Sequence, residues 1–258
     1  MDYIWLKTFT EENQAAIDRL KAVCLSRDDR LPLLNLPEQP EECDGCLAAV
    51  TDAFEIVGIL TALYGEKTVE VCVLVHPEYR GSGIGTELLH RLILSTKKIP
   101  VFPVAAEDTD AKTFLTYIGK REMWREMLMT LSKENYSDEK PKAAAPGKKQ
   151  LRVTCKTHSV PEKEADVTSD RQMRYTLYLG PVPIGHCLVT EGCISEVWIR
   201  GMLRQRGYGS FLLRTVIRHQ FHLGRRSLVL HVTNLNGAAC ALYRRYGFEV
   251  TEEVAYYF

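Results

Sequence analysis

"RGSGIG" spans Arg80–Gly85, and a looser version, "RQRGYG", spans Arg204–Gly209. In both stretches an arginine leads and glycines stand at the same two later positions, with the copies 124 residues apart. Each stretch lies between a run rich in β-branched residues and a run with apolar residues at helical spacing. The pattern predicts a strand, a tight turn and a helix, and the first N–H groups of such a helix can bind an anion.

The sequence around the two turns is also repeated. The preceding strands VEVCVLV and CISEVWI match, as do the following helices ELLHRLIL and FLLRTVIR. Upstream, Gly58 aligns with Gly185, and downstream Gly119 aligns with Gly247. Blocks that keep their order with small changes in length are typical of a duplicated domain.

A charged segment with two prolines separates the copies and predicts a linker at residues 133–149. The domains are then expected at residues 1–132 and 150–258. In each, antiparallel strands precede a strand–turn–helix–strand–helix unit, which predicts an α+β fold with a mixed, mostly antiparallel sheet flanked by helices. The first domain adds a helix, EENQAAIDRLKAVCL, for which the second has no counterpart.

The bulk composition excludes some classes of partner. Lys+Arg and Asp+Glu both number 33, so no global basic field favours nucleic acid or an anionic membrane. The N-terminus lacks the pattern of a signal peptide, and no apolar run is long enough for a membrane helix, so a cytoplasmic protein is expected. The eight cysteines are expected as reduced thiols; Cys43 and Cys46 form a C-x-x-C without a second pair, so no metal site is expected.

Two other phosphate-binding turns do not fit. A Walker loop ends in G-K-[ST], but Thr86-Glu87 follow Gly85. A dinucleotide fingerprint needs a third glycine further along, and the turns lack it. The motif by itself is a weak signal, because a tight turn without a ligand would have the same sequence.

With their surroundings, "VHPEYRGSGIGTELL" and "NGAACALYRRYGFEV" resemble the GNAT superfamily of acetyl-CoA-dependent N-acyltransferases. The first matches the pattern V-x-P-x-x-R-G-x-G-x-G, and the second matches N-x-x-A-x-x-L-Y-x-x-x-G-F. The resemblance covers most of both halves, so the chain resembles a tandem GNAT protein.

The resemblance implies that the fourth and fifth strands of a domain splay apart and that the pantetheine of acetyl-CoA inserts between them. The residues that it implies for cofactor binding in the second domain are Val197, Ile199, Arg204, Gln205, Arg206, Gly207, Tyr208, Gly209, Ser210 and Asn236. A second site in the first domain stays open, at Val73, Val75, Arg80, Gly81, Ser82, Gly83, Ile84 and Gly85.

The family's chemistry is direct attack of an amine on the thioester, which relies on proximity and on acid–base catalysis. Tyr243 would protonate the leaving thiolate, although it could also be a core residue with its hydroxyl at the edge. Glu196 and His231 compete for the role of general base, and a water chain is the third possibility.

The first domain lacks these groups. Leu115 stands in place of Tyr243, Cys72 in place of Glu196, and Pro103 in place of His231; Asp108 and Lys120 replace Asn236 and Phe248. We therefore expect the second domain to catalyse acetyl transfer to a primary amine of a small molecule or peptide, and the first domain to be catalytically degenerate. The alternatives are a non-catalytic acyl-CoA-binding or regulatory protein and a structural interaction protein. The acceptor and the oligomeric state are not determined by the sequence.

Overall fold

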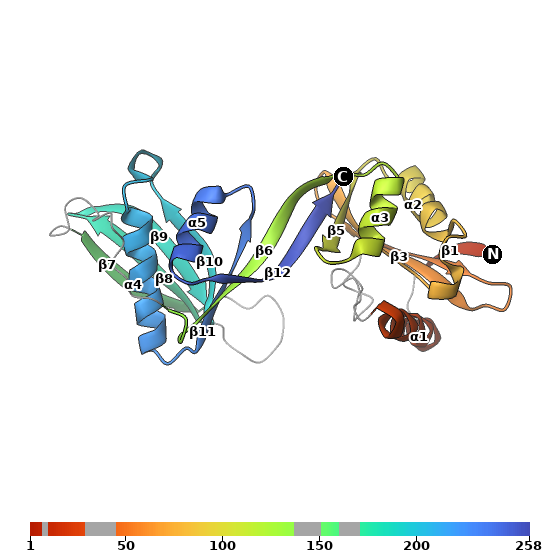
Figure 1. The fold of residues 1–258 in the computed structure, drawn as a ribbon, viewed down its shortest axis with the longest axis horizontal. Coiled ribbons are helices and arrows are strands. Elements are labelled where there is room, and N and C mark those ends of the chain that lie inside the picture. The colour runs from red at the N-terminus through yellow and green to blue at the C-terminus, as the bar shows by residue number, and fades with distance from the viewer. Residues whose placement is uncertain (7–9, 29–44, 137–150, 160–170) are drawn as a thin grey trace. The chain divides into compact units, whose positions relative to one another are not determined.

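The computed structural model describes residues 1–6, 10–28, 45–136, 151–159 and 171–258 (Figure 1). The chain divides into two compact units: unit 1 is Met1–Arg125 with Val254–Phe258, and unit 2 is Glu126–Glu253. Each unit has a mixed sheet with helices, which confirms the predicted α+β class.

In unit 1 the sheet order is β1-β2-β3-β4-β5-β12. Helices α2 and α3 lie on one side of this sheet, and α1 lies on the other (Figure 1). The elements are β1 (Asp2–Leu6), α1 (Glu11–Asp28), β2 (Gly45–Val50), β3 (Ile56–Tyr64), β4 (Thr68–Val75), the 3₁₀ turn η2 (Pro77–Tyr79), α2 (Ile84–Ser95), β5 (Ile99–Ala105), α3 (Thr109–Tyr117) and the start of β6 (Glu122–Ser132).

In unit 2 the order is β6-β11-β10-β9-β8-β7. Helices α4 and α5 pack on one face of this sheet, and no described helix of unit 2 packs on the other. The elements are β7 (Leu151–Ser159), β8 (Arg171–Leu179), β9 (Val182–Thr190), β10 (Cys193–Ile199), the 3₁₀ turn η4 (Gly201–Leu203), α4 (Tyr208–His222), β11 (Ser227–Thr233), α5 (Gly237–Arg245) and β12 (Glu249–Tyr257). None of the described helices is long and apolar enough to cross a bilayer.

The repeat extends to the pairing of individual residues. Gly58 of β3 pairs with Val75 of β4, and Gly185 of β9 pairs with Ile199 of β10. The alignment of the two halves in the sequence is therefore also an alignment of strand register.

Burial differs between the copies because of α1. Its residues Ile17, Leu20 and Cys24 form an apolar cluster with Ile59 and Leu74 of the sheet, so β3 is buried on both faces. In β9 buried and partly exposed residues alternate from Gly185 onward, as expected for a strand covered on one face only.

Two strands pass from one unit into the other. Strand β6 begins in unit 1 and ends in unit 2, where Ser227–Thr233 of β11 pair antiparallel with it. Strand β12 begins in unit 2 and ends in unit 1, where Val254–Tyr257 pair with β5. Each copy of the repeat therefore supplies a strand to the sheet of the other copy. A single boundary in the sequence cannot separate the two sheets. The boundaries 1–132 and 150–258 stay a prediction about the duplicated sequence, and the linker at 133–149 lies almost wholly outside the described residues.

The exchange predicts that the end of the chain stabilises unit 1. Tyr257 is 6% exposed and belongs to the core of that unit. Tyr257→Ala should destabilise unit 1 by about 3 kcal/mol, the usual cost of truncating a buried aromatic residue. The labelling rate of the buried thiol of Cys72 in unit 1 should rise by about two orders of magnitude, while that of Cys187 in unit 2 stays unchanged.

The control is Tyr117→Ala in the same unit, because Tyr117 is 82% exposed. A larger increase in the labelling rate of Cys187 than in that of Cys72, caused by Tyr257→Ala, would contradict the exchange of strands between the units.

Candidate functional site

The glycine turn of unit 2 presents an open row of backbone donors. Gly207 caps the start of α4 with φ +84°, a left-handed conformation that favours glycine, and Gln205 also has a positive φ of 59°. The first helical hydrogen bond is donated by Phe211 N to Gly207 O. Among the described residues, the backbone N–H groups of 205–210 have no partner. This is the arrangement that binds phosphate at a helix start.

Arg204, the first residue of the turn, forms a hydrogen bond to the end of the preceding strand. Arg204 Nε donates to the carbonyl of Ile199 at 3.0 Å, and Arg80 Nε donates to Val75 O at 3.1 Å in unit 1. The family resemblance implied that Ile199 binds the cofactor and left Val75 open as part of a second site; in the structure the carbonyls of both residues accept a hydrogen bond from an arginine. The two terminal nitrogens of Arg204 have no partner among the described residues, so they remain able to donate.

The neighbouring strands separate beside this turn. Parallel pairing of β10 with β11 is limited to Cys193 with Val229 and Ile194 with Leu230. A register shift follows between Ile194 and Glu196, and the rest of β10 pairs with β9 alone. The backbone of Val197 is thus open on the side of β11, as the expected splay requires. In unit 1 the pairing of β4 with β5 also stops early, at Glu70.

Tyr243 lies on α5 with its ring in the core of unit 2. The residue is 8% exposed, and its ring lies 5.8 Å from that of Phe248. Its hydroxyl has no hydrogen-bond partner among the described residues. Every fully buried side-chain oxygen of the described residues has a hydrogen-bond partner. Because the Tyr243 hydroxyl has none among them, it must be at least partly exposed to solvent. Burial, followed by nearby Cys187 and Cys240, raises the pKa of Tyr243 to about 12. The group therefore holds its proton firmly at neutral pH.

Other residues of the predicted set have structural roles. The Oδ1 atom of Asn236 accepts from Ala239 N at 3.2 Å and caps α5, as Asp108 caps α3 in unit 1. The side chains of Tyr208 and Ser210 are buried, and Ser210 Oγ lies 2.7 Å from the hydroxyl of Tyr246. These positions could bind a ligand through backbone groups while their side chains hold the helix.

The two predicted bases stand in different surroundings. Glu196 Oε2 lies 2.9 Å from Nε2 of His186, a residue of β9 that the sequence reading missed. His231 Nδ1 lies 3.8 Å from Oε1 of Glu126, and both of these side chains are exposed. A signal for His186 was present, because the repeat aligns it with the apolar Ile59 of unit 1.

The corresponding positions in unit 1 carry other residues in different surroundings. Leu115 is 3% exposed in the position of Tyr243. Cys72 replaces Glu196, and burial raises the pKa of its thiol to about 12. Pro103 pairs with Tyr256 of β12 in the position of His231.

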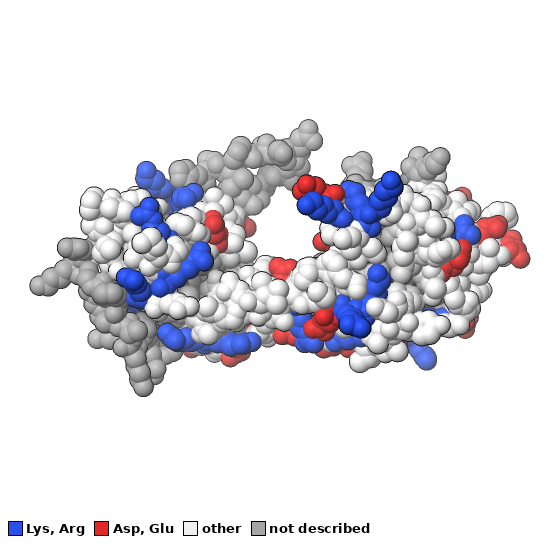
Figure 2. Space-filling model, turned by 90° about the horizontal axis from the view of Figure 1, so that it is seen from above, with Lys and Arg blue, Asp and Glu red and all other residues white. Residues whose placement is uncertain are grey.

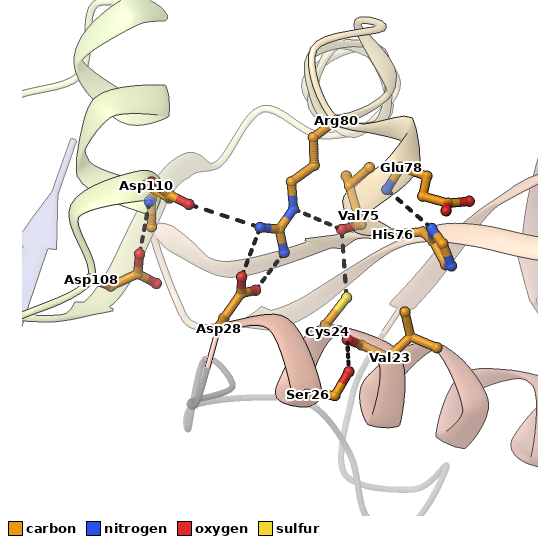
Figure 3. A network of polar contacts seen from close by, with 11 residues as sticks. Val23, Cys24, Ser26, Asp28, Val75, His76, Glu78, Arg80, Asp108 and Asp110 are labelled. Atoms are coloured by element: carbon orange, nitrogen blue, oxygen red, sulfur yellow. Dashed lines mark hydrogen bonds and ion pairs between the residues drawn. The ribbon is translucent and has the colours of Figure 1, made fainter.

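The turn of unit 1 also differs in charge. Arg80 donates to both carboxylate oxygens of Asp28, at 3.0 and 2.5 Å, and Asp110 lies 3.9 Å away (Figure 3). The same figure shows Cys24 directed at the carbonyl of Val75, with Sγ 3.5 Å from the oxygen. The ion pair with Asp28 raises the pKa of Arg80. The arginine that leads this turn is thus already paired with carboxylates of the chain.

In unit 2 no acidic residue stands in the first turn of η4, α4 or α5, and Arg200, Arg204 and Arg206 surround the turn. On the face drawn in Figure 2, the charged residues that unit 2 (left) displays are mostly Lys and Arg, whereas unit 1 displays charged residues of both signs. The field around the turn of unit 2 therefore favours an anion. Cys46 of the C-x-x-C pair is buried in β2, and Cys43 lies outside the described residues.

The acetyltransferase (GNAT) family model matches residues 4–98 and again residues 148–248. The chain belongs to this family, in tandem form. The match supports acyl transfer as the general class of reaction. A search of curated proteins gave no match.

Solved structures share the tandem fold. A GCN5-related N-acetyltransferase from Sphaerobacter thermophilus is 20% identical, with a TM-score of 0.60 over 99% of this chain and 94% of that one. A tandem GNAT protein from the clavulanic acid biosynthesis pathway is 14% identical, with a TM-score of 0.63 over 99% and 98%. A glucosamine N-acetyltransferase region of a fungal multi-domain GH3 β-N-acetylglucosaminidase is 13% identical, with a TM-score of 0.62 over 100% and 38%. At these identities the likeness concerns the fold alone.

Tyr243 in α5 and Tyr246 at its end should differ in how much the free energy of unfolding depends on their hydroxyl groups. The Tyr246 hydroxyl donates to Ser210 O at 2.8 Å and is buried. Tyr246→Phe should therefore lower the free energy of unfolding by about 1–3 kcal/mol. Tyr243→Phe loses no hydrogen bond to the described residues and should change it by less than about 0.5 kcal/mol. Urea unfolding of both variants measures this, and a large loss with Tyr243→Phe would mean that its hydroxyl is structural.

Proposed function

We propose that unit 2 transfers an acetyl group from acetyl-CoA to a primary amine, and that unit 1 has no catalytic activity. The contrast between the two copies of the glycine turn carries this proposal. Both turns have backbone N–H groups without a partner among the described residues, but Arg80 of unit 1 is paired with Asp28, whereas Arg204 of unit 2 has no carboxylate partner in the described part of the chain. Acetyl-CoA would supply the acyl group as an activated thioester.

The residues of unit 2 fit such a cosubstrate along its length. The N–H groups of 205–210 and the terminal nitrogens of Arg204 would hold the diphosphate. The open backbone edge of Val197 would pair with the amides of the pantetheine arm, as an added strand does at a sheet edge. This arrangement would bring the thioester into the gap between β10 and β11, beside Tyr243.

The proton transfers follow from the two groups at this gap. Glu196 would take a proton from the acceptor ammonium, so that the neutral amine can attack the acyl carbon. A C–N bond then forms, the C–S bond breaks, the nitrogen releases its second proton to solvent, and the Tyr243 hydroxyl protonates the departing sulfur. A raised pKa suits Tyr243 to this role, because it arrives at the reaction still protonated. Glu196 is preferred over His231 as the base, because it lies two residues beyond Ile194, the last β10 residue that pairs with β11, where the two strands have separated.

The number of acetyl-CoA molecules bound per chain tests whether only the turn of unit 2 binds the cosubstrate. Calorimetry should give one site per chain. Gly207→Val should abolish binding, because valine is strained at φ +84° and the turn must rearrange. Gly83→Val is the matched control, since Gly83 has a φ of +86° in unit 1, and it should leave binding unchanged.

Two sites in the wild-type chain, or loss of binding in the Gly83 variant alone, would contradict the assignment to unit 2. Circular dichroism of both variants would establish that each is folded.

The role of Tyr243 is tested by kinetics. Tyr243→Phe should lower kcat by about 10²- to 10⁴-fold, the usual contribution of a general acid. Its Kd for acetyl-CoA should stay within about twofold, because the phenyl ring keeps the packing with Phe248. Unchanged kcat would remove Tyr243 from the mechanism. Binding of acetyl-CoA without transfer to any amine would instead leave a non-catalytic acyl-CoA-binding protein.

A further inference from the structure

Helix α4 carries positive charge at the end that lies away from the glycine turn. From Val197 to Phe248 the sequence has nine arginines and no aspartate or glutamate. Some of these arginines surround the turn, but Arg218, together with His219 and His222, belongs to the last turns of α4. At about 1.5 Å per residue, the two ends of this helix lie about 21 Å apart. The positive charge at its C-terminal end is therefore separate from the diphosphate site proposed at its start.

A hollow of about 550 Å³ lies at this end of the helix. Basic and aromatic side chains line it, from Lys133, Tyr136, Arg218, His219, Phe221 and His222. None of these described lining residues is acidic. The rings of Tyr136 and Phe221 contact each other, with centroids 5.6 Å apart and planes inclined by 62°. The hollow therefore combines positive charge with an aromatic wall, and its volume is in the range of small-molecule pockets.

The imidazole of His219 is held by a buried chain of hydrogen bonds. Gln220 Nε2 donates to the hydroxyl oxygen of Tyr175 at 2.7 Å, and this oxygen lies 2.8 Å from His219 Nδ1. Tyr175 and Gln220 are 1% and 2% exposed. Burial raises the pKa of Tyr175, so its hydroxyl keeps the proton and donates it to Nδ1, a better acceptor than the sulfur of Met173 at 3.7 Å. His219 then carries its own proton on Nε2 and can donate from there.

Unit 1 shows that the fold does not require this network. Strand pairing places the fully buried Leu47 in unit 1 where unit 2 has Tyr175. Helix α2 ends at Ser95, which aligns with His219, so the last turn of α4 has no helical counterpart. A buried hydroxyl and amide cost more to desolvate than a leucine. The network replaces a simple apolar contact only in the copy where it ends on a residue of the hollow.

The helix dipole does not cancel the positive charge of the hollow. The carbonyl groups at the end of α4 are already hydrogen-bonded within the chain. His219 O accepts from Leu223 N at 2.9 Å. Gln220 O accepts from Arg225 N at 3.2 Å. The basic side chains therefore determine the sign of the field, which favours an anion.

We propose that this hollow binds a small organic anion that has an acidic head group and a flat apolar body. Lys133 and Arg218 would pair with the head group, and the Nε2–H of His219 would donate to it. The rings of Tyr136 and Phe221 would pack against the apolar body. The buried network positions the imidazole without touching the ligand. This site does not depend on the proposed function, because it lies at the opposite end of α4 from the turn.

Three probes test the two parts of the ligand: 2-naphthoate as the anion, 2-naphthamide as its neutral analogue, and acetate as a head group without the body. Calorimetry with the full chain should give one site for 2-naphthoate. The amide and acetate should each bind at least about tenfold more weakly, because one lacks the charge and the other the apolar surface. Saturation with acetyl-CoA should leave the binding of 2-naphthoate unchanged.

Variants that remove one charge locate the site. Arg218→Gln and Lys133→Gln should each raise the Kd of 2-naphthoate about 3- to 30-fold. Arg244→Gln is the matched control, because Arg244 is an exposed residue of α5 outside the hollow and its substitution removes the same charge. It should leave the Kd unchanged.

Nitrogen NMR of the imidazoles tests the buried network. The chain has seven histidines, and His219→Phe assigns the signals of His219. These signals should indicate a proton on Nε2 and should shift with 2-naphthoate. Tyr175→Phe should mix the two neutral forms of the imidazole and raise the Kd about 3- to 10-fold, whereas a purely structural hydroxyl would change stability alone. The two surface variants decide the site even if Tyr175→Phe does not fold.

Several outcomes would overturn the site. These are equal affinity for 2-naphthoate and 2-naphthamide, an equal loss of affinity in the Arg218 and Arg244 variants, and no shift of His219. Displacement of 2-naphthoate by acetyl-CoA would place the anion at the glycine turn and would also overturn it. Failure of acetyl transfer would overturn the proposed function and leave this site as it is.

Discussion

The site depends on a backbone conformation at one residue. Gly207, with φ +84°, ends the extended segment after β10 and starts α4, and so leaves the N–H groups of 205–210 without partners in the described part of the chain. Those donors face outward because the helix that follows is anchored by Leu212, Leu213, Val216 and Ile217, all fully buried. A side chain with a Cβ would be strained at this angle, and a different turn would use the donors within the chain. In the proposed function, the position of the diphosphate, and through it that of the thioester, would follow from this constraint.

The two copies share the turn but differ in the charge around it. Both have the turn, the glycine in the left-handed region and the arginine that binds the end of the strand. In unit 1 the C-terminal residue of α1, Asp28, supplies the negative charge that a phosphate would otherwise bring. The arginine is a fold element in both copies, and its terminal nitrogens are available only where no carboxylate of the chain reaches them.

The same helix accounts for the second difference. By covering one face of its sheet, α1 permits apolar residues such as Ile59 and Leu74 there, whereas the equivalent face of unit 2 carries His186, Trp198 and Glu196. Polar groups need solvent or a partner, so the chemistry of a face depends on its cover. Exchange of β6 and β12 links the two copies, because the sheet of unit 2 includes a strand that begins in unit 1 and the sheet of unit 1 includes one that begins in unit 2.

The sequence by itself determined the duplication, the α+β class, the two turns and the contrast between Tyr243 and Leu115, because glycine spacing and helix periodicity are local properties that survive divergence. It also suggested Glu196 as one of two candidate bases, and that role stays a prediction. Only the tertiary structure decided that Arg204 holds Ile199, that Asp28 pairs with Arg80, that His186 reaches Glu196 and that β6 and β12 change units. These are contacts between residues distant in sequence or on neighbouring strands, and their geometry depends on how the sheet and helices pack, which no local pattern encodes.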